Sequence, residues 1–183
     1  VAARERMNYI LGNDGSVYGW TANDFSQPSQ EAKTNQRRAE PNILFAIEDQ
    51  LPKEEPSDTI FQLSFPKSTK ITSVTLCTYF GLFLTEQGLV YGLGKNEYGQ
   101  LGLGHENPVA SPELLEDFKA KNEKIVEISA GHKHFVAKSN VGNVFTCGYN
   151  GFGQLGSDNT KNAIYPYNVK LASTKLEKLV PLK

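Results

Sequence analysis

Gly94-Lys95-Asn96-Glu97-Tyr98-Gly99-Gln100-Leu101-Gly102 decides the fold, because the chain repeats it 54 positions later (148 − 94) as Gly148-Tyr149-Asn150-Gly151-Phe152-Gly153-Gln154-Leu155-Gly156. The same offset lays residues 124–156 over residues 70–102 without a gap. Self-similarity at a fixed period is the signature of a repeat architecture, so the fold is predicted from its repeating unit.

A third, degenerate copy of the unit opens the chain. Gly15-Ser16-Val17-Tyr18-Gly19-Trp20 matches residues 88–93 at an offset of 73 (88 − 15), but the glycines of the following loop are missing. We therefore predict a degenerate repeat in 1–70, with an acidic insert at about 43–65, and repeats in 71–124 and 125–183. Three repeats fall short of the ~4–8 blades that close a propeller, so we expect a fragment of a larger propeller.

Each repeat contains short runs of alternating apolar and polar residues between glycine-rich turns, which indicates strands. The first three strands of the two clear repeats are expected at Ile71–Leu76 and Ile125–Ala130, Phe80–Thr85 and 134–138, and 89–92 and 143–147. An outer strand is expected after each proline, at 113–115 and 167–170. The predicted fold class is all-β, a partial β-propeller of four-stranded antiparallel blades, with no helix longer than about three turns.

The shared motif residues have structural reasons to recur. Glycines supply the positive φ of a tightly winding loop, and asparagine bonds nearby backbone and tolerates left-handed conformations. Leucine would fill the gap between blades, and Tyr18, Tyr91 and Phe145 would pack blade on blade. The predicted structural positions are Gly94, Asn96, Gly99, Gln100, Leu101, Gly102, Gly148, Asn150, Gly153, Gln154, Leu155 and Gly156.

The order of these motifs resembles a known family. Gly-x-Val-Tyr-x-x-Gly-x-Asn-x-x-Gly-Gln-Leu-Gly begins at Gly88, and after a proline Ile-Val-x-Ile-x-Ala-Gly-x-x-His begins at Ile125. Together they resemble the regulator of chromosome condensation repeat, strongly over 70–183 and weakly over 1–27. The resemblance implies a seven-bladed propeller and a structural role for His134, near the hub and hydrogen-bonded to backbone. It also implies a small GTPase as one candidate partner.

Composition and motifs argue against several function classes. The formal net charge is −1, which argues against the basic stripe that a nucleic-acid-binding protein normally carries. No apolar run reaches the ~20 residues of a membrane span. His132 and His134 would need a third ligand, such as His105 or Cys147, to hold a metal. Neither Cys77 nor Cys147 has a motif that lowers a thiol pKa. No catalytic or phosphate-binding motif occurs, so we expect no enzyme activity and no cofactor.

One segment departs from the repeat. From Pro41 to Ile71 there are 30 positions, against 13 from Pro112 to Ile125, an excess of 17. Two apolar runs flank an acidic tip, and this pattern predicts a long hairpin over 43–65. The tip is either a solvated loop or an element that binds a partner with a basic surface. The acidic residues at issue are Glu48, Asp49, Glu54, Glu55 and Asp58.

The resulting hypothesis is a non-enzymatic scaffold for protein–protein interaction, within a larger protein or assembly. Two alternatives stay open: a guanine-nucleotide exchange factor for a small GTPase, and a propeller module of a ciliary or cytoskeletal protein or of a ubiquitin ligase. The expected location is intracellular, cytoplasmic or nuclear, with no direct binding of nucleic acid or membrane.

Overall fold

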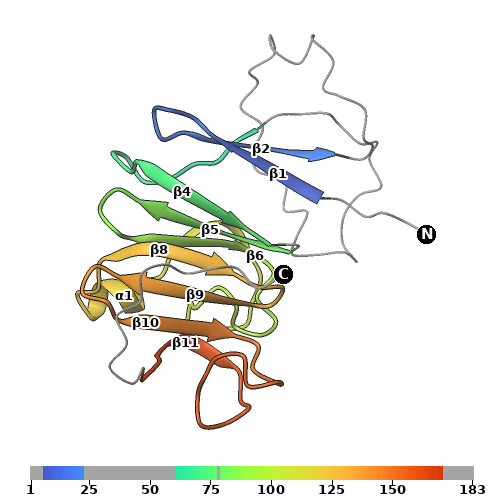
Figure 1. Cartoon of the computed structure of the whole chain (residues 1–183). Helices are drawn as coiled ribbons and strands as arrows, with labels where there is room; N and C mark the ends of the chain where they lie inside the picture. The colour runs from blue at the N-terminus through green and yellow to red at the C-terminus, as the bar shows by residue number, and fades with distance from the viewer. Residues whose placement is uncertain (1–5, 23–60, 78, 171–183) are drawn as a thin grey trace.

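The computed structural model describes residues 6–22, 61–77 and 79–170, and these residues form three antiparallel sheets that stack as successive blades (Figure 1). The first blade has the strand order β1 (Arg6–Leu11), β2 (Val17–Ala22), β3 (Phe61–Gln62). The middle blade has the order β4 (Ile71–Leu76), β5 (Phe80–Thr85), β6 (Val90–Gly94), β7 (Val109–Leu114). The third blade has β8 (Ile125–Ala130), β9 (His134–Ser139), β10 (Val144–Gly148), β11 (Ala163–Asn168). The predicted all-β fold of antiparallel blades is confirmed, four-stranded in the middle and third blades.

The outer strands differ from their predicted positions. β7 and β11 begin before the prolines and contain them, whereas we expected strands only after Pro112 and Pro166. Each proline lies beside an irregularity in the pairing with the neighbouring strand, between Gly92 and Gly94 in one blade and between Thr146 and Gly148 in the other. Proline is tolerated there because an edge strand or a bulge does not need the missing N–H.

The insert also ends earlier than predicted. β3 pairs with β2, so residues 61–62 belong to the first blade and not to a projecting hairpin. Leu63 is buried, and the Phe65 ring packs edge-on against Phe83 and Tyr91 at centroid distances of 5.4 and 5.5 Å. The side chains of Leu63 and Phe65 therefore belong to the core between the first two blades. Residues 43–60 of the predicted hairpin lie outside the described residues.

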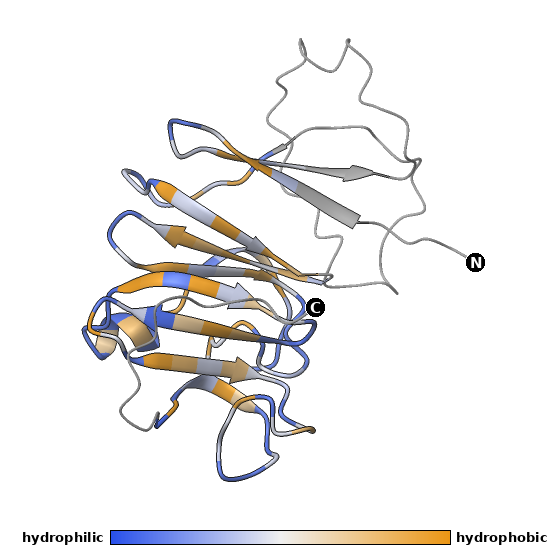
Figure 2. Ribbon diagram, in the orientation of Figure 1, coloured by the Kyte–Doolittle hydropathy of each residue, from blue (hydrophilic) through white to orange (hydrophobic). Residues whose placement is uncertain are grey.

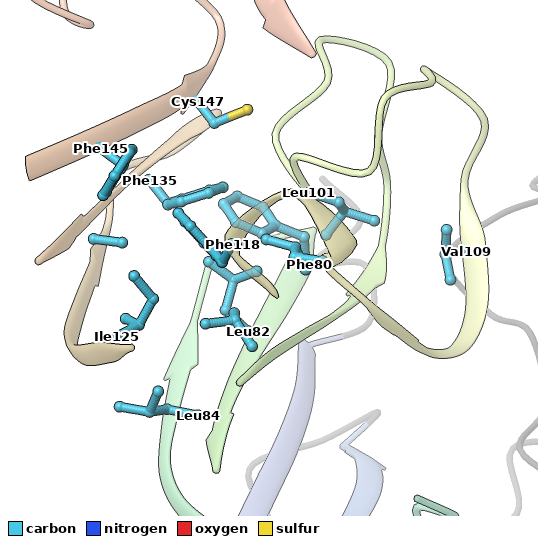
Figure 3. Close-up of a cluster of buried hydrophobic side chains, with 13 residues drawn as sticks. Phe80, Leu82, Leu84, Leu101, Val109, Phe118, Ile125, Phe135, Phe145 and Cys147 are labelled. Atoms are coloured by element: carbon cyan, nitrogen blue, oxygen red, sulfur yellow. The ribbon is translucent and has the colours of Figure 1, made fainter. Parts of the chain in front are cut away.

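Apolar residues concentrate along the strands, and hydrophilic residues concentrate in many of the connecting loops (Figure 2). The buried apolar residues form two cores, one on each side of the middle blade. The core shared with the first blade contains Val17, Leu63, Ile71, Phe83, Tyr91 and Leu93. The core shared with the third blade contains Phe80, Leu82, Leu84, Val90, Leu101, Val109, Leu115, Phe118, Ile125, Phe135, Ala137, Phe145 and Cys147 (Figure 3). Tyr91 and Phe145 thus pack blade on blade as expected, whereas Tyr18 is only half-buried.

The helix α1 (Glu116–Ala120) supplies a core residue that the repeat pattern did not predict. Its Phe118 is fully buried, and the ring lies 5.3 Å from that of Phe145 and 6.5 Å from that of Phe135. Burying one such side chain stabilises the fold by about 1.5–3 kcal/mol. This helix therefore contributes to the core between the middle and third blades.

Candidate functional site

The loop between β6 and β7 is built on the side chain of Asn96, which is fully buried. Its Oδ1 accepts the backbone N–H of Leu101 at 2.9 Å, and its Nδ2 donates to the His105 carbonyl at 2.7 Å. Gln100 adds a further bond within the loop, because its Oε1 accepts the N–H of Tyr98 at 2.9 Å. These hydrogen bonds give the polar groups of the loop partners inside the protein, where water does not reach them.

The loop between β10 and β11 repeats this arrangement. The Oδ1 of Asn150 accepts the N–H of Leu155 at 3.0 Å, and its Nδ2 donates to the Asn159 carbonyl at 2.7 Å. The Oε1 of Gln154 accepts the N–H of Phe152 at 2.9 Å. The motif residues are therefore the internal frame of each loop, and the positions between them are free to differ.

The glycine that opens each motif brings two loops together. Gly94 has φ 115° and a Cβ there would lie 2.5 Å from the carbonyl oxygen of Tyr79, so only glycine allows the approach. The N–H of the next residue, Lys95, then donates to that same carbonyl at 2.8 Å. In the third blade Gly148 has φ 109°, and the N–H of Tyr149 donates to the Lys133 carbonyl at 2.9 Å.

These bonds place side chains from four loops on one face. In an antiparallel meander the first and third connections lie at the same end of the sheet, so the loops after β4, β6, β8 and β10 share one end of the blades. Ring contacts join them across blades: Tyr79 lies 5.7 Å from His132, and Tyr98 lies 5.2 Å from Tyr149. We call this surface the loop face, and it consists of Tyr79, Lys95, Tyr98, His132, Lys133, Tyr149 and Phe152.

Sequence reasoning assigned the motif residues to the architecture but missed the loop face. The signal was present in the aligned repeats, where aromatic residues and lysines occupy positions between the repeated glycines and asparagines. Tyr98 aligns with Phe152, for example, at the offset of 54 (152 − 98). Loop positions of this kind commonly carry binding residues on a rigid scaffold.

His134 differs in detail from the expectation. Its imidazole lies against Gly131, where a Cβ would be 2.2 Å from the ring, and its backbone carbonyl accepts the Gly131 N–H at 2.8 Å. The expected side-chain hydrogen bond to backbone is not found within the described residues. Burial alone lowers the pKa of His134, so the ring is neutral at neutral pH.

The cysteines occupy different environments. The Cys147 Sγ lies 2.9 Å from the Ala163 carbonyl oxygen and 3.3 Å from that of Gly99, and burial raises the thiol pKa. The Cys77 Sγ contacts the Gly131 carbonyl. In the described ranges no group of three or more His, Cys, Asp and Glu residues is placed to hold a metal ion.

Two other features bear on the site hypotheses. Glu48, Asp49, Glu54, Glu55 and Asp58 all lie outside the described residues, so the acidic insert is not placed. Of the part of the chain that is described, no helix has the length and apolar character needed to cross a membrane.

Comparison with known proteins identifies the repeat. The model of the regulator of chromosome condensation (RCC1) repeat matches residues 87–137 and 141–180, and a second RCC1 repeat model matches residues 125–154. Together the matches extend over 87–180, more than half of the 183 residues.

Curated relatives carry similar segments within longer chains. The human "Probable E3 ubiquitin-protein ligase HERC4" is 43% identical over 86 residues, 47% of this chain and 8% of the ligase. The bovine "Secretion-regulating guanine nucleotide exchange factor" is 41% identical over 76 residues, 42% of this chain and 16% of the relative. The chain thus spans less than a fifth of these relatives.

Among solved structures, that of Prp20p from Saccharomyces cerevisiae is similar over 92% of this chain and 37% of its own, with a TM-score of 0.67 and 15% identity. That work describes the binding of Prp20p to Gsp1p and histones. At this identity the likeness establishes the fold alone.

Proposed function

The chain belongs to the RCC1 repeat family, and we propose that it acts as a non-enzymatic scaffold that binds proteins through the loop face. One observation carries the proposal: the asparagine and the leucine of each motif are buried as the frame of the loop, while residues between them reach solvent. Asn96 and Asn150 are fully buried, whereas Glu97, between the motif residues of the middle blade, is exposed. A rigid frame that presents different side chains from each repeat suits recognition better than chemistry.

Site-specific photo-cross-linking tests this function. A photoreactive phenylalanine analogue replaces Tyr98 on the loop face or, as a control, Val141, which is 71% exposed in the β9–β10 turn at the other end of the blades. In cell extract we expect discrete protein adducts from position 98 and none from position 141. The proposal fails if neither position 98 nor a third probe placed at Phe152 cross-links to a protein.

Guanine-nucleotide exchange on a small GTPase is a second candidate, supported by the similarity to the bovine exchange factor. Exchange predicts that the chain accelerates release of a fluorescent GDP analogue from a GTPase panel. Release rates equal to those without the chain exclude this activity and leave the scaffold function untouched. The similarity to HERC4 supports a third role, as the propeller module of a ubiquitin ligase.

The acidic insert forms a second part of the proposal. Its five acids would attract a basic partner over roughly a Debye length, ~8–10 Å in physiological salt. Deleting residues 48–58 should leave the thermal midpoint unchanged but weaken partner recovery at low ionic strength. Unchanged recovery at low salt would show that the insert is only a solvated loop. An intracellular location, cytoplasmic or nuclear, also stays a proposal, to be checked by imaging the tagged protein.

A further inference from the structure

We propose that Asn150 is a deamidation site, at which the backbone nitrogen of Gly151 attacks the side-chain amide once the loop between β10 and β11 opens. The product is an aspartate or an isoaspartate in the frame of that loop. This modification site does not depend on the proposed scaffold function, and the equivalent loop of the middle blade does not share it.

The sequence makes Asn150 different from every other asparagine in the chain. Only Asn150 is followed by glycine, whereas its counterpart Asn96 is followed by Glu97. A side chain on the following residue hinders the approach of the backbone nitrogen to the asparagine amide, and glycine has no side chain. Asparagine is also among the thermolabile residue types. The pair Asn150-Gly151 is therefore the most reactive asparagine site in the sequence.

The reaction proceeds in two steps and consumes only water. The Gly151 nitrogen loses its proton and forms a bond to Cγ of Asn150, the bond from Cγ to the amide nitrogen breaks, and ammonia leaves. Water then opens the resulting succinimide ring at one of its two carbonyls. Opening at one carbonyl gives aspartate, and opening at the other gives isoaspartate. Overall, one water is consumed for each ammonia released.

The packing of Tyr149 explains why glycine occupies position 151. A Cβ at this position would overlap the Tyr149 ring. That ring packs edge-on against Tyr98 of the middle blade, at a centroid distance of 5.2 Å. In the middle blade the same two positions carry Lys95 and Glu97, at the offset of 54 (149 − 95, 151 − 97). The contact of Tyr149 with the middle blade therefore favours the glycine that makes the asparagine before it reactive.

The folded loop protects the amide. Asn150 is fully buried, and its Oδ1 accepts the Leu155 N–H at 3.0 Å. Its Nδ2 donates to the Asn159 carbonyl at 2.7 Å and to the Ser157 Oγ at 2.9 Å. All three partners belong to the same loop, so this protection does not depend on a neighbouring blade. Attack by the Gly151 nitrogen requires the amide to leave these partners, and the reaction therefore proceeds from the opened loop.

Deamidation would remove a hydrogen-bond donor from the frame of the loop. The nitrogen Nδ2 is replaced by a carboxylate oxygen, which then faces the Asn159 carbonyl oxygen, and neither atom can donate a hydrogen bond. A buried carboxylate also loses the hydration that it has in water. Isoaspartate in addition carries the side-chain methylene in its backbone, which lengthens the loop. The modified loop is therefore less stable than the original.

Peptide mapping by mass spectrometry tests the site. The 183-residue chain is incubated at mildly alkaline pH, either folded or unfolded in guanidinium chloride, and conversion is followed in the tryptic peptide that spans residues 139–161. Fragmentation assigns the conversion to individual asparagines within that peptide. Asn140 is the internal control, because it is exposed and is followed by valine.

Three variants sharpen the test. Glu97→Gly makes Asn96 the first residue of a second asparagine–glycine pair. The double variant Tyr149→Lys with Gly151→Glu gives the third blade the residues of the middle blade and removes the site. Ser157→Ala removes one hydrogen bond from the protected amide, so the loop should open more often.

We expect Asn150 to convert faster than every other asparagine of the unfolded chain. In the folded chain its conversion should be slower by roughly tenfold or more, because only the opened loop reacts. Ser157→Ala should raise the rate in the folded chain about threefold. In unfolded chains the double variant should convert position 150 no faster than Asn140, and Glu97→Gly should add conversion at Asn96.

The variant Asn150→Asp supplies the aspartate product directly. Its thermal midpoint should lie below that of the wild type, whereas Asn140→Asp, at the exposed control position, should melt as the wild type does. If Asn150→Asp does not fold, the deamidated fraction of the wild type is separated by ion exchange and melted instead.

Three results would overturn the inference. The first is conversion of Asn150 no faster than that of Asn140 in the unfolded chain, and the second is an equal rate in the folded and unfolded chains. The third is no conversion in the folded chain over about a hundred half-times of the unfolded reaction. An unchanged midpoint of Asn150→Asp would show that the loop does not need the amide. None of these results bears on the scaffold function, which photo-cross-linking at Tyr98 tests.

Discussion

The loops over 94–102 and 148–156 have the same internal hydrogen bonds but different surroundings. At Gly99 a Cβ would lie 2.7 Å from the Cα of Ile164, whereas at Gly153 no atom lies within 4 Å. Both glycines have positive φ, 69° and 74°, as expected. The difference reflects the following blade: Ile164 of the third blade packs against Gly99, whereas no blade after the third is described beside Gly153.

The sharpest test of this contrast is valine at each position. Gly153→Val should destabilise the fold by about 2 kcal/mol, because a β-branched residue is forced to positive φ. Gly99→Val should cost about 4 kcal/mol, because overlap with Ile164 adds to that strain. Urea denaturation with matched m-values measures both. Equal losses of stability at the two positions would show that β11 shifts away from the new side chain at Gly99 with no loss of free energy.

The hydrogen bonds that the two loops share predict equal losses of stability when they are removed. Asn96→Ala and Asn150→Ala should each cost about 3 kcal/mol, because each leaves a buried leucine N–H and a loop carbonyl without a partner. Asn140→Ala is the control, an exposed asparagine in the β9–β10 turn, and should stay within about 0.5 kcal/mol of the wild type. A loss below about 1 kcal/mol in either loop would mean that water replaces the amide.

The smallest effect concerns His134, which occupies the position of Phe80 in the middle blade (134 − 80, the same offset). Burial lowers the His134 pKa below its ordinary value of 6.5, so the unfolded chain binds the proton more tightly than the folded chain. This contribution to stability is complete above 6.5 and is lost as pH falls through 6.5 toward the folded pKa. Thermal midpoints of wild type and His134→Phe, measured from pH 8 to pH 5 at about unit steps, should diverge only in that window. A difference in thermal midpoint that stays constant from pH 8 to pH 5 would show that His134 does not cause the pH dependence.

The strands β5 and β9 extend the comparison to whole blades. Every residue of β5 is buried, because the middle blade packs on both of its neighbours. In β9 buried and half-buried residues alternate: Phe135 and Ala137 are buried, and Val136 and Lys138 are not fully covered. The same strand position is thus a two-sided core in one blade and a one-sided core in the other.

Much of the fold could be predicted because the strand signal is local. The predicted bounds of β4, β5 and β8 agree with the structure, since alternation and glycine turns define inner strands within a few residues. The outer strands β7 and β11 were misplaced, because whether a proline ends a strand depends on which neighbour it pairs with. That information is not contained in a short window of sequence.

The loop face could be predicted only in part, for a similar reason. Whether Lys133 lies over Tyr98, 35 positions away, depends on the packing of one blade on the next. The repeat alignment indicates only that variable residues occupy equivalent positions. The burial of Leu63 and Phe118 likewise arises from contacts outside the repeated motif, so neither was expected in the core.

Cys147 gives the interface between the middle and third blades a built-in chemical reporter. Its thiol is fully buried and its pKa is raised, so an alkylating reagent can react only after the two blades separate. The labelling rate at Cys147 therefore measures how often this interface opens under native conditions, without an engineered cysteine. Cys77, which is partly exposed at the β4–β5 loop, should label on a faster and independent time course.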